Sequence, residues 1–218
     1  MANALIIGAG AIGRGFLPWL LDDLDIFFYD LSISLVDEIN FQGNFSSYMS
    51  HNNSHLLRKL IQPCCITHNL SEIPLDIIDI CFICVGPRNV KRIPDEISHI
   101  KCPIYSLEND PNTVEVIKKK YLLEKVYFGV PDVITSSTAS PENLIEDKLS
   151  LHTENGILYL QDADIETHLK DKLPDVRWLS RDRFKQEWDA KFFLHNTTHC
   201  IAAYLGFIKG ATYVHQGL

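Results

Sequence analysis

The chain has 218 residues, 46% of them hydrophobic and 22% charged, which is ordinary for a globular protein with one sizeable domain and part of a second. Its formal net charge of -8, with no offsetting basic stripe, argues against a general nucleic-acid or anionic-membrane binder. No apolar run reaches the roughly 18 residues of a membrane span, and no charged signal region precedes the first apolar run, so a cytoplasmic location is expected.

A glycine-rich turn follows the first apolar run at residues 4–7. Gly8 permits a tight turn, Gly10 lets the backbone approach a pyrophosphate, and Gly13 allows close helix packing. A helix expected over 16–24 would direct its free N–H groups at the phosphates, with Arg14 as a further anion contact. The pattern predicts a dinucleotide-binding turn, whose cofactor-binding residues are Gly8, Gly10, Ala11, Ile12 and Gly13.

An acidic residue closes the second apolar run, at residues 26–29. Asp30 lies 17 positions after Gly13, close to the roughly 20 typical of the carboxylate that binds the adenosine ribose. A carboxylate repels a 2′-phosphate, and residues 31–34 contain no Arg to neutralise one, so NAD is favoured over NADP. Asp30 alternatively caps a helix that begins near Ser32, and the two roles are compatible.

Apolar runs alternate with helical or loop material along most of the chain. The five runs expected to be strands are 5–7, 26–29, 80–85, 104–107 and 126–128. They predict an α/β fold with a doubly wound, Rossmann-type parallel sheet. Residues 41–69 break the rhythm as an excursion of loop or edge strands, and 149–152 and 157–160 are expected to be antiparallel strands appended to the sheet. Residues 1–180 are therefore expected to form an NAD-binding domain, followed by the start of a helical domain at 181–218.

Two loops follow predicted strands at their carboxyl ends, where open α/β sheets bind ligands. Gly86, in Val-Gly-Pro, would let the backbone run close to a cofactor ribose. Asn109 can donate and accept at once, which suits a nicotinamide ribose or a substrate hydroxyl. Both segments are equally explained as ordinary turn chemistry.

Six cysteines lie mostly inside apolar runs, which favours buried, reduced thiols. Cys81 and Cys84 match C-x-x-C, but residues three apart on a strand point to opposite faces and cannot share a metal. No redox or zinc site is expected.

Three polar side chains recur at helical spacing late in the chain. At about 100° per residue, Asn196 lies roughly 140° and His199 roughly 80° from Lys191, so all three share one arc, while Phe193, Leu194 and Ile201 point elsewhere and are expected to pack inward. A desolvated lysine can accept a hydroxyl proton while an amide and an imidazole bond the oxygen, which suits alcohol oxidation.

Two other interpretations of this segment remain open from spacing alone. The first is a solvated polar stripe. The second is a metal site on His195 and His199, but Asn196 stands where H-E-x-x-H needs Glu and no third ligand is evident, so no metal is predicted.

Four segments of the sequence belong together: residues 8–16, Val-Gly-Pro at 85–87, Glu-Asn at 108–109 and the K-x4-N-x2-H of Lys191 to His199. Together they resemble the polyol-specific long-chain dehydrogenases. The resemblance spans residues 4–206 and implies an NAD-dependent oxidoreductase that interconverts a polyol or polyol phosphate, such as mannitol or mannitol 1-phosphate, with the matching ketose. It implies Lys191 as general base, and Asn196 and His199 as groups that polarise the reacting oxygen.

The resemblance also places Asn109 and Asp132 beside the substrate, although the family's Arg after that aspartate is replaced by Val133. Family members continue through a helical domain that completes the substrate pocket. An inactive NAD-binding fragment is therefore an alternative. A second enzyme interpretation is a related hexuronate (fructuronate or tagaturonate) dehydrogenase. Exposed apolar residues such as Phe192, Tyr204 and Phe207 would favour a homo-oligomer.

Overall fold

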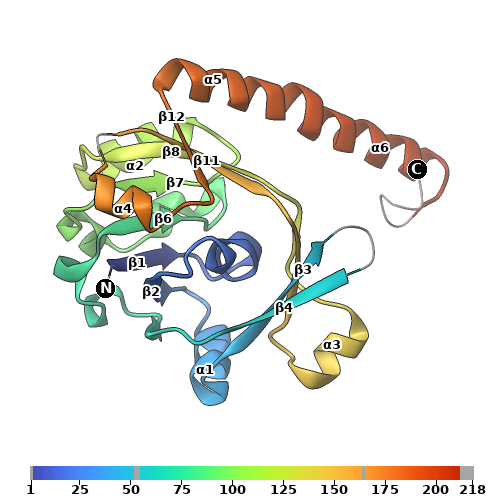
Figure 1. Cartoon of the computed structure of the whole chain (residues 1–218), viewed down its shortest axis with the longest axis horizontal. Helices are drawn as coiled ribbons and strands as arrows, with labels where there is room; N and C mark the ends of the chain where they lie inside the picture. Colours follow the sequence, from blue (N-terminus) through green and yellow to red (C-terminus); the bar gives the residue numbers. More distant parts are fainter. Residues whose placement is uncertain (1, 52–54, 164, 212–218) are drawn as a thin grey trace. The chain divides into compact units, whose positions relative to one another are not determined.

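The computed structural model describes residues 2–51, 55–163 and 165–211 (Figure 1). Backbone contacts divide the chain into two units, residues 1–178 and 179–218.

The first unit is built on a large, mostly parallel sheet. Its strands are β1 (Ala2–Ile7), β2 (Leu24–Tyr29), β5 (Cys65–Thr67), β6 (Ile80–Ile83), β7 (Ile104–Ser106), β8 (Val126–Asp132), β11 (Ile157–Gln161) and β12 (Val176–Leu179). They are ordered β12-β11-β8-β7-β6-β1-β2-β5, and the run from β8 to β5 is parallel. The chain moves outward from β1 to β5 and then crosses to the other side of β1, which confirms the doubly wound sheet. The strand order reverses between β1 and β6, where such folds bind ligands.

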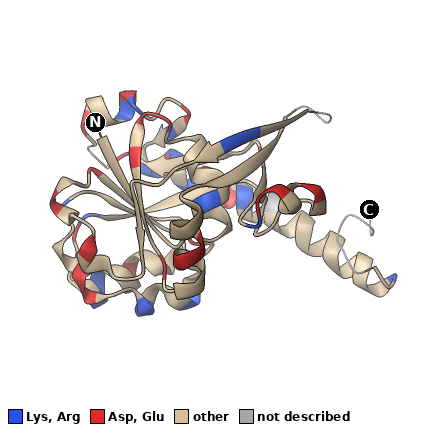
Figure 2. Ribbon diagram, turned by 90° about the horizontal axis from the view of Figure 1, so that it is seen from below, with Lys and Arg blue, Asp and Glu red and all other residues tan. Residues whose placement is uncertain are grey.

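Strand β1 is buried on both faces. Ala4 and Ile6 belong to one hydrophobic cluster, Leu5 and Ile7 to the other, and all four are 0% exposed. Neither β1, β6 nor β7 carries a charged residue, and the charges lie mainly on the surrounding helices and loops (Figure 2). This double burial explains the continuous apolar runs in the sequence.

Of the two strands expected to extend the sheet in antiparallel fashion, only the second does so. Strand β11 is antiparallel to β8. The prediction for the first was wrong: β10 (Leu151–Glu154) belongs to a second sheet, ordered β4-β3-β10-β9, and is parallel to β3. The other strands of this sheet are β3 (Phe45–His51), β4 (His55–Ile61) and β9 (Thr135–Ser136).

Asp147 explains why β10 joins the second sheet. Its buried carboxylate accepts hydrogen bonds from Ser46 N, at the start of β3, and from Leu149 N, just before β10. The two segments are thereby held side by side. The excursion at residues 41–69 is thus mainly the β3–β4 hairpin, which supplies the edge that β10 occupies.

Helices complete the first unit. The α-helices are α1 (Ile33–Gln42), α2 (Asn112–Tyr121), α3 (Pro141–Glu146) and α4 (Thr167–Asp171). Short helical turns are η1 (Ala11–Phe16), η2 (Leu17–Trp19), η3 (Leu70–Glu72), η4 (Leu75–Ile77), η5 (Pro87–Arg92) and η6 (Asp95–His99). The helix expected over 16–24 was placed too late: helical turns cover 11–19, the first of them with π-type hydrogen bonding, and Leu24 already pairs with Ala2 in the sheet.

The second unit contains successive helical segments, α5 (Arg181–Ala190), the π-helical turn η7 (Lys191–Asn196) and α6 (Thr197–Ile208). This agrees with the helical character expected from residue 181 onward. Phe193, Leu194 and Ile201, expected to pack inward, are 65%, 70% and 54% exposed, so that prediction was wrong. The apolar residues expected to be exposed, Phe192, Tyr204 and Phe207, are so.

The six cysteines are free thiols. Cys81 lies in one core cluster and Cys84 packs against the other, which confirms that they face opposite sides of the sheet. Cys64 and Cys200 are exposed, so the expectation of buried thiols does not hold for these two.

Candidate functional site

Two of the three glycines in the turn are required by close backbone contacts. Gly8 has a φ of +104°, and a Cβ there would lie 2.5 Å from the carbonyl oxygen of Cys84. A Cβ at Gly13 would lie 2.0 Å from the carbonyl oxygen of Gly8. A Cβ at Gly10 would meet nothing within 4 Å. The first and last glycines therefore shape the turn, while the middle one leaves open space beside it.

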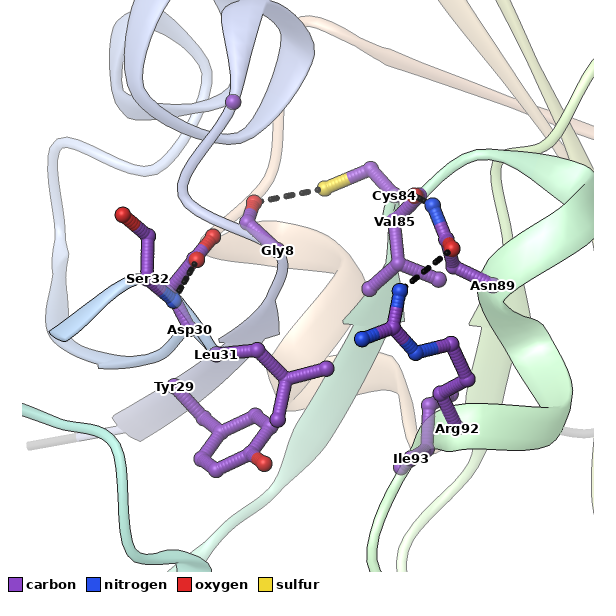
Figure 3. A pocket seen from close by; sticks show the side chains of 11 residues that line it. Gly8, Tyr29, Asp30, Leu31, Ser32, Cys84, Val85, Asn89, Arg92 and Ile93 are labelled. Atoms are coloured by element: carbon purple, nitrogen blue, oxygen red, sulfur yellow. Dashed lines mark hydrogen bonds between the residues drawn. The ribbon is translucent and has the colours of Figure 1, made fainter. Parts of the chain in front are cut away.

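A cavity of about 320 Å³ opens beside this turn, at the carboxyl ends of the central strands (Figure 3). Its lining residues are Gly8, Gly10, Tyr29, Asp30, Leu31, Ser32, Cys84, Val85, Asn89, Arg92 and Ile93. Of the residues predicted to bind the cofactor, Gly8, Gly10 and Asp30 line it. Ala11, Ile12, Gly13, Gly86 and Asn109 are not among the lining residues.

Asp30 joins two walls of the cavity. Its carboxylate accepts a hydrogen bond from Ala9 N, in the glycine turn, at 2.7 Å and another from Ser32 N at 2.8 Å. The N-cap of α1 is Ser32, whose hydroxyl accepts from Leu35 N. Asp30 is therefore not the helix cap itself, and its carboxylate lies between the glycine turn and the start of α1.

The opposite wall comes from η5, which sequence reasoning did not include. Asn89 Nδ2 donates to Val85 O at 2.8 Å, and Arg92 Nη1 donates to Asn89 Oδ1 at 3.4 Å. A 3-10 helix repeats every three residues, so Asn89 and Arg92 follow one line along η5. That three-residue spacing after Val-Gly-Pro is the signal from which the two side chains were predictable.

Glu108 is a second residue whose role the sequence did not reveal. It is 5% exposed, and its Oε1 accepts from Val85 N at 2.7 Å and from Gly86 N at 3.0 Å. The carboxylate thus fixes the turn after β6, including Gly86 with its φ of +87°. Burial raises the pKa of Glu108 to about 7, although the two amide hydrogen bonds oppose the shift.

The raised pKa of Glu108 predicts a pH-dependent stability. The folded state binds the proton of the Glu108 carboxyl group more tightly than the unfolded state does. The contribution of this protonation to the stability of the fold is therefore complete below about pH 4.3 and is lost as pH rises through about 7. Glu108→Gln should remove this loss, so that its free energy of unfolding relative to the native chain rises by roughly 2–3 kcal/mol between pH 5 and pH 8. Urea unfolding at several pH values measures it, with the exposed Glu124→Gln as the matched control. Parallel pH profiles for native chain and Glu108→Gln would contradict the assignment.

Arg14 is not available to an anion in the way the sequence suggested. It is buried, with Nε donating to Ala9 O at 2.6 Å and Nη1 donating to Leu149 O at 2.9 Å. Its guanidinium lies over the ring of Phe45, and burial lowers its pKa to about 10. Arg14 therefore connects the glycine turn to the second sheet.

The two residues expected beside the substrate lie at the same edge of the large sheet. Asn109 is exposed and directly follows the buried Glu108 in the loop after β7. Asp132 is half-buried and is the last residue of β8. Strands β7 and β8 are parallel neighbours, so their carboxyl ends bring both residues to the edge where the cavity opens.

The three predicted catalytic residues lie in the second unit. Lys191 and Asn196 are the first and last residues of η7 and are half-buried, and His199 is an exposed residue in the first turn of α6. Hydrogen bonds in a π-helix run from i to i+5, so Lys191 and Asn196 are one turn apart. The side chain of His195, the other half of the alternative metal pair, lies outside the described residues.

Within the described ranges, no group of three or more His, Cys, Asp or Glu residues is arranged to hold a metal ion. In the same part of the chain, every helix is too short or too polar to cross a membrane.

Solved structures share the Rossmann-like fold of this chain. D-mandelate dehydrogenase in complex with NADH superposes with a TM-score of 0.65, at 16% identity, over 98% of this chain and 68% of that one. A 2-dehydropantoate 2-reductase from Porphyromonas gingivalis W83 gives a TM-score of 0.58, at 15% identity, over 82% of this chain and 63% of that one.

Sequence comparison confirms the resemblance to polyol dehydrogenases. The chain is similar over its whole length to mannitol-1-phosphate 5-dehydrogenases from Thermoanaerobacter pseudethanolicus, at 26% identity, and Lactococcus lactis, at 25%. It spans 62% of the length of each of these relatives. No family model matches the chain.

Proposed function

We propose that this chain belongs to an NAD-dependent polyol or polyol-phosphate dehydrogenase that acts on mannitol 1-phosphate or mannitol, and that it binds the dinucleotide. The observation that carries the proposal is the cavity at the switch point of the sheet, lined by Gly8, Gly10 and Asp30, in a chain similar throughout to mannitol-1-phosphate 5-dehydrogenases.

The residues at the cavity suit an adenine dinucleotide. The open space at Gly10 leaves room for a pyrophosphate beside the backbone. The Asp30 carboxylate can accept hydrogen bonds from the two ribose hydroxyls and would repel a 2′-phosphate, which supports NAD rather than NADP. When bound, the nicotinamide supplies a hydride acceptor for the substrate carbon.

The polar residues of the second unit are assigned to the chemistry at the substrate oxygen. Lys191 accepts the hydroxyl proton, and Asn196 and His199 hydrogen-bond the oxygen as it becomes a carbonyl. Asn109 and Asp132, at the sheet edge, are assigned to the substrate hydroxyls. The π turn that separates Lys191 from Asn196 by one helical turn supports this grouping, since such turns are frequent at functional sites.

A second candidate is a module that binds NAD without turnover. It is favoured by Val133, which stands where the polyol dehydrogenases that the sequence resembles have an arginine after the aspartate.

Binding and turnover separate these two candidates. NADH fluorescence titration should show saturable binding, and Asp30→Ala should weaken it about 10-fold or more, because the ribose hydroxyls lose a charged acceptor. Asp37→Ala, an exposed aspartate on α1, is the matched control. Reduction of NAD by mannitol 1-phosphate or mannitol supports the dehydrogenase, and binding without reduction supports the module. A native chain that binds neither NADH nor NADPH overturns both.

A further inference from the structure

Leu31 and Arg92 approach the same cavity from opposite walls. Leu31 follows Asp30 at the end of β2, and Arg92 ends η5 after β6. In Figure 3 the Leu31 side chain and the Arg92 guanidinium both point into the space between the two walls. Leu31 is 48% exposed, so its apolar side chain is available for contact with a ligand in the cavity.

The guanidinium of Arg92 is held in place without being neutralised. Its hydrogen bond to Asn89 Oδ1, at 3.4 Å, and the bond from Asn89 Nδ2 to Val85 O, at 2.8 Å, connect it to the turn after β6. Glu108 holds that turn by accepting hydrogen bonds from Val85 N and Gly86 N. Within the part of the chain that the structure describes, Arg92 forms no ion pair with a carboxylate.

A guanidinium and an aliphatic side chain that point into one cavity can together hold a flat aromatic group. Guanidinium planes stack on flat aromatic systems, and an aliphatic side chain packs equally well on the other face of such a ring. Ile93 and Val85, which also line the cavity, extend its apolar surface. The carboxylate of Asp30, beside Leu31, would then receive the sugar attached to the ring.

We propose that Arg92 and Leu31 hold the adenine ring of the dinucleotide between them, the guanidinium plane on one face and the leucine side chain on the other. The proposal rests on the proposed function for the identity of the ligand. It assigns adenine recognition to a residue 62 positions from Asp30 in the sequence, on the other side of the switch point.

The test compares a ligand that contains adenine with one that lacks it. Arg92→Ala should weaken NADH binding about 5- to 30-fold, because it removes the flat face that stacks on the ring together with its charge. Binding of reduced nicotinamide mononucleotide, which has no adenine, should change less than about 2-fold. Arg92→Phe, which keeps a flat face without the charge, should bind NADH within about 3-fold of the native chain. Arg88→Ala is the control, because Arg88 is an exposed arginine on the same η5 helix and does not line the cavity.

Several results would overturn the proposal. Equal weakening of both ligands assigns Arg92 to the pyrophosphate or to the shape of the turn. A loss for NADPH much larger than for NADH assigns it to a 2′-phosphate. Arg92→Phe that binds as weakly as Arg92→Ala shows that charge, not the plane, matters. Unchanged NADH binding in Arg92→Ala ends this inference alone, whereas a native chain that binds no NADH ends the proposed function as well.

Discussion

Replacing Gly13 with alanine is expected to destabilise the first unit by about 3 kcal/mol or more. The added Cβ would lie 2.0 Å from the carbonyl oxygen of Gly8 and 3.1 Å from Cys84 Sγ. The first of these is backbone that is itself fixed, because Gly8 N donates to Tyr29 O in the sheet. Neither side can yield without displacing η1 from the turn. Urea unfolding followed by circular dichroism measures the loss.

Gly10→Ala is the matched variant, since it adds the same methyl group at the preceding glycine of the motif. A Cβ there would meet nothing within 4 Å, and the φ of -81° suits alanine, so stability should stay within about 1 kcal/mol. Its NADH affinity should nevertheless fall about 10-fold or more, because the methyl group occupies space proposed for the pyrophosphate. If the two variants lose the same stability, the turn is not organised around the Gly13 contact.

The centre of the parallel sheet was predictable because strands such as β1 are buried on both faces, so their sequences are continuous apolar runs. The pairing of β10 with β3 was not predictable, because it depends on Asp147, whose carboxylate accepts hydrogen bonds from Ser46 N and Leu149 N. Hydrogen bonds between segments about 100 residues apart leave no mark on local hydrophobic periodicity. In the sequence, a buried aspartate in a loop, such as Asp147, cannot be distinguished from an ordinary turn residue.

The candidate site divides in the same way. Gly8, Gly10 and Asp30 were identified because their spacing is set by one local unit, a strand, a turn and the next strand. Arg92 was missed because it reaches the cavity from across the switch point, through η5. Glu108 was missed because it acts indirectly, from the loop after β7, by accepting hydrogen bonds from Val85 N and Gly86 N. Residues 31–34, directly after Asp30, contain no arginine, yet the fold brings Arg92 to the same cavity. Cofactor preference is therefore a property of both walls.

The late helix shows a different limit. A wheel of 100° per residue assumes α-helical geometry, but Lys191 to Asn196 form a π-helical turn, so their angular separation follows a different repeat. The sequence predicted a helix there, and nothing in its composition distinguishes the two helix types. The relative position of Lys191 and Asn196 therefore follows the i to i+5 hydrogen-bond spacing of a π-helix and not the 100° per residue of an α-helix.

Lys191→Ala is expected to reduce NAD reduction by mannitol 1-phosphate or mannitol about 100- to 10,000-fold, the range for loss of a general base. NADH affinity should be unchanged, because the cavity and Asp30 lie in the first unit and Lys191 in the second. The loss should appear in kcat more than in KM, since the proton is transferred only in the chemical step. Stopped-flow or steady-state absorbance of NADH, with a parallel binding titration, measures both quantities.

Lys185→Ala is the control for this experiment. Lys185 lies on α5, close in sequence to Lys191, and its ammonium forms an exposed ion pair with Asp189 at 3.3 Å. Exposed pairs of this kind contribute about 0.5 kcal/mol or less to stability, so turnover should stay within about 2-fold of the native rate. Loss of turnover in both variants indicates that the helix, not the base, was disturbed. Full activity in Lys191→Ala would remove Lys191 from the reaction and leave the proton acceptor to be sought among Asp132, Glu108 and His199.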